Sequence, residues 1–282
     1  MADEKVDRKT GLAAGLVETL ATVAIALAIA MVPRIVLGQP YTIPSESMQP
    51  TLQVGDYVIV SKFPYGWSRH SVPFSPPLGQ GRVFGRAPRR GDIIVFMKPN
   101  DNREEIIKRL VGLPGDRLQV VAGVLTINGR PVKREALADG VEDTPYGAPV
   151  QVARFRETLP GGKSFVTDTY GPQGAQENTG VYVAPPGCYF MMGDNRDNSL
   201  DSRFAPGVPR PGESRCAWNH ELDRFLPPEA GMGFVPFDDL IGRADLVLFS
   251  LKPGASLLKP WTLITRMRWD RTFHGLGAAS AS

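Results

Sequence analysis

The chain has 282 residues, of which 42% are hydrophobic and 22% charged, so it can bury a sizeable core and is too apolar for a disordered protein. Its net charge is +3 at pH 7, and its Lys and Arg residues form no basic stripe interleaved with aromatics, which argues against nucleic-acid binding. The 30 Gly and 26 Pro, set among short runs rich in Val and Ile, predict a mainly β body.

An apolar segment near the start of the chain predicts one transmembrane helix at residues 11–38, preceded by a cytoplasmic N-terminus at residues 1–10. The segment is dominated by Ala, Leu, Val and Ile, and residues 19–33 carry no charge. A helix needs about 20 apolar residues to cross a bilayer, and Glu18 and Arg34 lie near enough to the ends to reach the interface.

The same segment also fits a cleavable signal peptide. Lys5, Arg8 and Lys9 can form a basic leading region, and Ala28-Ile29-Ala30 has the small-x-small pattern of a cleavage site. Either interpretation predicts that the globular body is exported.

After this segment the chain is a succession of short strand signals separated by turns. Gly-Asp pairs precede several of them, and these residues tolerate the backbone angles that turns require. The strand signals lie at residues 57–61, 92–96, 106–111, 118–121, 188–192 and 244–251. They predict a main domain of short antiparallel strands, formed by residues 39–133 and 187–252.

Residues 134–186 change in composition to Gly, Pro, Thr and Asp around two alternating runs, 150–158 and 164–170. Two such runs joined by Pro-Gly-Gly predict a long hairpin, so we expect a smaller inserted β subdomain. Residues 253–282 form a C-terminal tail with two Trp and several Arg. This tail is either a surface segment of the domain or a peripheral membrane contact.

The two cysteines, Cys188 and Cys216, form no CxxC motif or Cys/His cluster, so the sequence predicts no metal site. In an exported body they can form a disulfide. Two buried free thiols fit the sequence equally well.

Ser47 lies in a proline-rich run between Pro44 and Pro50, nine residues beyond Gly38. The prolines restrict the backbone and would help to hold the serine hydroxyl in place, close to the membrane surface. Taken alone, a serine in such a loop is typical of a turn.

A catalytic serine needs a base, and the histidines of this chain offer none. His70, His220 and His274 lie in no recognisable triad context, and there is no GxSxG elbow. A lysine is the remaining candidate. To act near neutral pH it must be buried, because its pKa has to fall by roughly three units from about 10.4.

Lys108 is the best placed lysine, because it lies inside a strand signal where a period of two puts Ile106 and Leu110 on its own face. Arg109, on the opposite face, is expected to point to solvent or to a salt bridge. Lys62 and Lys98 lie at strand ends beside proline-containing loops and are expected to be solvated.

A polar run at residues 193–203, GDNRDNSLDSR, is by itself typical of a turn. Together with other segments it resembles the type I signal peptidases, the leader peptidases of bacteria. The resemblance covers, in the family's order, the apolar segment, Pro44–Leu52, Gly55–Val58, Lys62–Gly66, Arg90–Phe96, Lys108–Asp116 and this polar run.

The resemblance implies a serine endopeptidase with a Ser/Lys dyad, in which Ser47 is the nucleophile and Lys108 the base, expected roughly 3 Å apart. It implies an oxyanion hole made by Ser45 and the backbone N–H of Ser47. Ser199 matches the family residue that orients the lysine. Met48, Asp201 and Arg203 match residues that support the site structurally. The chain departs from the family at Glu46, where a small residue is common, and matches it poorly over residues 134–186.

The resemblance also implies a single-pass protein of the bacterial inner membrane, with its catalytic domain on the outer, periplasmic side. Its partners would be membrane lipid, the signal peptides of preproteins and, indirectly, the export machinery. It would cut preproteins after small-x-small sites and would need no cofactor. Two alternatives remain: a self-cleaving, repressor-like Ser/Lys protease, which would need a DNA-binding module, and an anchored scaffold, which would tolerate loss of Ser47 or Lys108.

Overall fold

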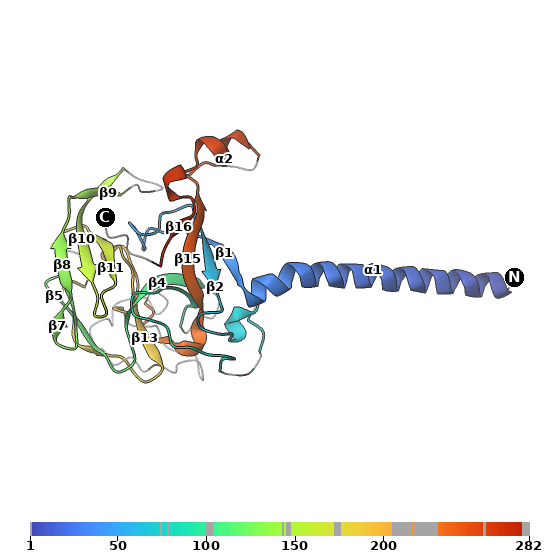
Figure 1. Cartoon of the computed structure of the whole chain (residues 1–282), viewed down its shortest axis with the longest axis horizontal. Coiled ribbons are helices and arrows are strands. Elements are labelled where there is room, and N and C mark those ends of the chain that lie inside the picture. Colours follow the sequence, from blue (N-terminus) through green and yellow to red (C-terminus); the bar gives the residue numbers. More distant parts are fainter. Residues whose placement is uncertain are drawn as a thin grey trace.

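The computed structural model describes residues 2–73, 75–77, 79, 81–99, 104–142, 144, 148–171, 176–204, 216, 231–255 and 258–277. A single long helix, α1 (Ala2–Val36), projects away from a β-rich body (Figure 1). It begins well before the predicted span of residues 11–38 and ends close to the end of that span. Its segment Val17–Val36, with a mean hydropathy of 2.1, is long and apolar enough to cross a membrane and is not buried by the body.

The largest sheet has eight antiparallel strands, in the order β1-β2-β15-β3-β4-β13-β14, with β16 paired to β15. Its strands are β1 (Gly38–Thr42), β2 (Asp56–Ser61), β3 (Ile93–Met97), β4 (Glu105–Gly112), β13 (Cys188–Met192), β14 (Val235–Pro236), β15 (Leu240–Ser250) and β16 (His274–Gly275). Strands from residues 38–112 and from residues 188–275 therefore form one sheet, and the predicted mainly β fold is confirmed.

Two further sheets have four strands each. The first has the order β11-β10-β8 with β9 paired to β10, and consists of β8 (Lys133–Ala136), β9 (Gly140–Glu142), β10 (Val150–Thr158) and β11 (Ser164–Thr169). The predicted hairpin is the β10–β11 pair. The second has the order β12-β5-β6-β7, from β5 (Arg117–Val121), β6 (Val124–Ile127), β7 (Arg130–Pro131) and β12 (Tyr182–Val183). The sequence pattern did not separate this second sheet from the main one.

The central strands of the main sheet are buried on both faces. All five residues of β3 are buried between β15 and β4, which is why this strand reads as a continuous apolar run. One core cluster contains Ile43, Met48 and Leu52, all from the loop after β1, together with residues of β2, β3 and β15. The apolar residues of this loop therefore fasten it to the sheet.

The C-terminal tail packs against the same loop through its arginines. Arg271 Nη2 donates to Thr51 O at 2.9 Å and pairs with the Asp56 carboxylate, and Arg268 Nη1 donates to Val54 O at 3.0 Å. Trp261 opens the short helix α2 (Trp261–Thr265), which protrudes from the body and leaves this Trp 62% exposed (Figure 1). The described part of the chain also contains the 3-10 helices η1 (Arg69–Ser71), η3 (Phe237–Asp239) and η4 (Trp269–Arg271).

Candidate active site

Ser47 lies at the first turn of the loop that follows β1. Its neighbour Met48 is completely buried in the core cluster beneath the loop, so the backbone beside Ser47 has little freedom. Ser47 itself is 8% exposed. The chain reaches this loop directly from α1 through the five residues of β1, so Ser47 is close in sequence to the end of the apolar helix.

Lys108 lies in β4 and points at Ser47. Its Nζ is 2.6 Å from Ser47 Oγ and donates to Ile107 O at 3.1 Å. Burial lowers the pKa of Lys108 to about 8, from 10.5 for a lysine in water, while the negative charges of Asp201 and Glu104 act in the opposite direction. A fraction of this amine is therefore neutral near pH 7, with its lone pair within hydrogen-bonding distance of a serine hydroxyl.

Burial alone does not single out Lys108, because Lys62 is buried as well. The expectation that Lys62 is solvated is wrong: it is 1% exposed, and its Nζ donates to Gln39 Oε1 at 3.3 Å and to Ser71 O. Burial lowers the pKa of Lys62 also to about 8. Its strand-end position misled the sequence argument, because the segment up to η1 folds back over it. What distinguishes Lys108 is a serine hydroxyl within 2.6 Å.

Ser45 lies next to the nucleophile candidate, with its Oγ 3.4 Å from Ser47 Oγ. Its side chain is on the exposed side of the loop. Among the described residues, the backbone N–H of Ser47 donates to no acceptor. The Ser45 hydroxyl and this N–H are two further donors beside the Ser47 side chain.

The polar run 193–203 folds into a turn that packs against the Ser47 loop. Asp201, which is fully buried, accepts hydrogen bonds from Gly193 N at 2.9 Å and from Arg203 Nε and Nη2 at 2.8 Å each. Gly193 is required here, because a Cβ at this position would overlap both Ser199 Oγ and Ser47 O. The turn therefore approaches Ser47 as closely as a backbone can.

Ser199 makes a different contact from the one that the resemblance implies. Its Oγ donates to Asp201 Oδ2 at 2.9 Å, and in the described part of the chain it makes no hydrogen bond with Lys108. Ser199 nevertheless lies close to the Ser47 backbone, because Ser199 Oγ and Ser47 O both contact the same side of Gly193.

Sequence reasoning missed the contacts that join the two loops. Arg109 is 2% exposed and forms a bidentate ion pair with Asp194, with Nε 2.7 Å from Oδ1 and Nη2 2.6 Å from Oδ2. Of the two expectations for Arg109, the salt bridge is correct and exposure to solvent is wrong. Asn195 N donates to Ser47 O at 3.2 Å, and Asn198 Nδ2 donates to Glu46 Oε2 at 2.7 Å. These residues lie inside the motifs that carry the resemblance, and their density of polar side chains was the available signal.

Cys188 and Cys216 form a disulfide, which ties residue 216 to β13. Among the described residues, no group of three or more His, Cys, Asp or Glu side chains is arranged to hold a metal ion.

Comparison with known proteins identifies the family. The family model "Signal peptidase, peptidase S26" matches residues 16–249. The signal peptidase I of Rickettsia typhi is 35% identical over 269 residues, which cover 89% of this chain and 90% of the relative. The chain belongs to the signal peptidase I family.

The other comparisons lie in the same family. The signal peptidase I of Rickettsia akari is 34% identical over 272 residues, 90% of each chain. A crystal structure of a signal peptidase I from Enterococcus faecalis matches with 24% identity and a TM-score of 0.29, covering 56% of this chain and 97% of that one. As a signal peptidase I, the protein is a serine endopeptidase that removes signal peptides from preproteins.

Proposed function

We propose that this signal peptidase works through a dyad of Ser47 and Lys108. Neutral Lys108 takes the proton of the Ser47 hydroxyl as Ser47 Oγ attacks the scissile carbonyl carbon, and later gives it to the amine of the departing mature protein. A water molecule, deprotonated in turn by Lys108, then hydrolyses the acyl-enzyme. The observation that carries the proposal is the 2.6 Å separation of Lys108 Nζ and Ser47 Oγ in a buried setting.

The neighbouring residues take supporting roles in this proposal. The Ser45 hydroxyl and the Ser47 N–H stabilise the oxyanion of the tetrahedral intermediate. Asp201 and Arg203 form a buried ion pair whose two charges act on the Lys108 pKa with opposite signs, and Ser199 orients the site through its hydrogen bond to Asp201. Met48 anchors the nucleophile loop in the core.

The pH dependence of cleavage tests the assignment of the base. Because neutral Lys108 is the active form and its pKa is about 8, kcat/KM should rise with pH up to about 8. Initial rates of preprotein cleavage by the purified full-length enzyme, measured across this range, give the profile. A rate that does not change through this interval would exclude Lys108 as the titrating base.

We also propose the domain division and the membrane arrangement that the sequence suggested. Residues 39–133 and 187–252 are the catalytic domain, residues 134–186 the inserted subdomain, and residues 11–38 the single-pass anchor in the inner membrane. The apolar helix Val17–Val36 supports anchoring. In this arrangement the body lies on the periplasmic side, where exported preproteins present small-x-small sites near the bilayer surface, and residues 1–10 lie in the cytoplasm. The tail, residues 253–282, touches lipid through its exposed Trp261 and Trp269.

Protease accessibility tests this topology. In spheroplasts, protease added from outside should digest the body and leave a short membrane-protected fragment that contains α1. A cytoplasmic marker protein must survive the same treatment, which shows that the membrane is sealed. Protection of the whole body would place it on the cytoplasmic side and contradict the proposed arrangement.

A further inference from the structure

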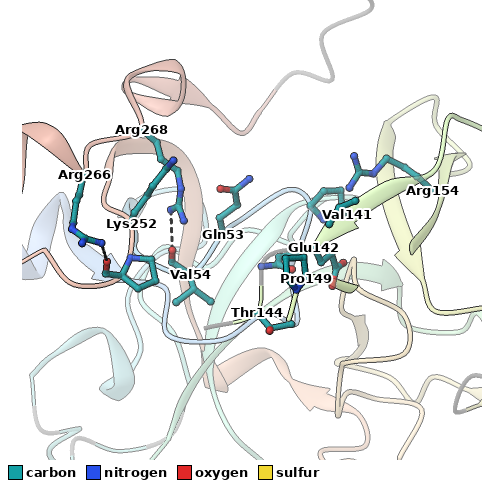
Figure 2. Close-up of a pocket in the computed structure, with 13 residues that line it drawn as sticks. Gln53, Val54, Val141, Glu142, Thr144, Pro149, Arg154, Lys252, Arg266 and Arg268 are labelled. Carbon is teal, nitrogen blue, oxygen red and sulfur yellow. Dashed lines mark hydrogen bonds between the residues drawn. The ribbon is translucent and has the colours of Figure 1, made fainter. Parts of the chain in front are cut away.

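The inserted subdomain places a buried carboxyl group next to the active-site loops. Glu142, the last residue of β9, is 4% exposed, and its Oε2 accepts from Asn195 Nδ2 at 2.8 Å and from Tyr170 OH at 3.2 Å. Its Oε1 has no hydrogen-bond partner among the described residues. Glu142 lies in the wall of a cleft of about 460 Å³ that Gln49 and Pro50 of the Ser47 loop also line (Figure 2).

Asn195 connects this carboxyl group to the nucleophile. Its side chain is held by Glu142, while its backbone N–H donates to the carbonyl of Ser47 at 3.2 Å. Asn195 is fully buried, and its side-chain oxygen accepts from Asn198 N at 3.1 Å, so both ends of the amide are fixed. A single residue therefore separates Glu142 from the backbone of Ser47.

The surroundings of Glu142 favour its protonated form. Burial is the largest effect that raises the pKa of Glu142, to about 7, and the neighbouring carboxylate of Asp168 adds to it. Glu46, on the Ser47 loop, acts in the same direction, and the hydrogen bond from Tyr170 acts against it. Asp168 is fully buried and bound by Arg154 at 2.8 and 2.7 Å, so this arginine is committed to Asp168.

A proton on Glu142 Oε1 would give both oxygens of this carboxyl group a hydrogen-bond partner. Protonated Glu142 donates from Oε1 to the Asp168 carboxylate, and its Oε2 still accepts from Asn195. Ionised Glu142 instead places a second negative charge against Asp168 in a buried site, where repulsion costs more than in water. Because Arg154 fixes Asp168, the Glu142 side chain is the group that moves away, and Asn195, whose amide donates to it, moves with it.

We propose that Glu142, in its protonated form, is a positioning residue that joins Asp168 to Asn195 and thereby holds the Ser47 backbone in its reactive place. The proposal rests on Ser47 being the nucleophile. It assigns to the insertion a part in catalysis, because the geometry of Ser47 then depends on a side chain of β9. Glu142→Gln reproduces the protonated group at every pH, since its amide donates to Asp168 and its oxygen accepts from Asn195.

Kinetics of the full-length enzyme in detergent micelles, from about pH 6 to about pH 9, test the proposal. We expect the ratio of kcat for Glu142→Gln to kcat for the wild type to rise severalfold across this range, because only the wild type loses its proton. Glu142→Ala should lower kcat by about tenfold or more with little change in KM, because it misplaces the nucleophile without touching the substrate.

Glu135→Gln is the matched control, because it makes the same chemical change at an exposed carboxylate of the same sheet and should give a ratio that is constant with pH. A constant ratio for Glu142→Gln overturns the proposal, as does a Glu142→Ala enzyme with wild-type kcat or with a raised KM alone. If Glu142→Ala does not fold, the Glu142→Gln ratio decides. Ser47→Ala separates the two proposals: if it is inactive and the ratio is constant, the positioning role fails and the dyad stands.

Discussion

Replacing Lys108 by Met is expected to lower preprotein cleavage by at least about 10³-fold while the protein stays folded, and Ser47→Ala should have an effect of the same size. The losses are large because the two groups act as a unit. Without the amine nothing accepts the hydroxyl proton, and without the hydroxyl the amine has no task. For the same reason the double variant should be no worse than either single variant.

Met fits the Lys108 site because it has a similar length and needs no hydration. The pKa of Lys108 is about 8 in the folded protein and 10.5 in water. As pH falls below 10.5 the unfolded chain gains a proton that the folded protein binds less readily, so the folded state loses stability. The full loss is present below about pH 8. Lys108→Met avoids this cost, and its melting temperature at pH 7 should not be below that of the wild type. Arginine would fail as a substitute, because it stays charged.

The matched control is Lys62→Met, the same change at the other buried lysine with a pKa of about 8. Its Nζ contacts Gln39 and Ser71, not the nucleophile, so this variant should keep most of its activity. Cleavage of a preprotein, followed on gels and by the mass of the product, measures the activity of these four variants relative to the wild type. An active, folded Lys108→Met variant would remove the dyad proposal, and an inactive Lys62→Met variant would mean that burial of any lysine matters more than contact with Ser47.

The sequence predicts the strands well and the buried polar groups poorly. Periods of two and apolar runs located β2, β3, β4, β13 and most of β15, because those strands pack their own side chains into the core, but they did not locate β1, β14 or β16. Burial of a polar side chain depends on segments far away in the chain. Lys62 was expected to be solvated, yet Gln39 and Ser71 enclose it.

In the candidate site, too, some residues could be predicted from the sequence and others could not. Lys108 follows from its strand and from the lack of a usable histidine, whereas Ser47 follows from resemblance, since a serine between prolines has no chemical signature of its own. Asn195 and Glu142 could not be foreseen, because their contact joins residues 53 positions apart, one of them in the segment that matches the family least. Such a contact exists only after the sheet that contains β9 has packed against the turn at residues 193–203.

Asp201→Ala is expected to destabilise the fold by about 3–5 kcal/mol, because it leaves the guanidinium of Arg203 buried without its partner. Arg203 is 2% exposed, and Asp201 provides both oxygens for its Nε and Nη2. Denaturant unfolding of the full-length protein in micelles measures the loss. Glu135→Ala breaks an exposed ion pair with Lys133 and should leave stability unchanged. The pair itself is not the source of the stability, so Asp201→Leu combined with Arg203→Met should recover much of the loss.

Asp201→Asn separates the electrostatic effect of this residue from its structural one. The charge of Asp201 raises the pKa of Lys108, so its removal should lower that pKa further and move the rising limb of the pH–rate profile to lower pH. Asn keeps one oxygen acceptor, so enough folded enzyme should remain for kinetics at low temperature. A limb that stays in place, or moves to higher pH, would show that Asp201 does not act on the base through its charge and that its contribution is confined to holding Gly193 and Arg203.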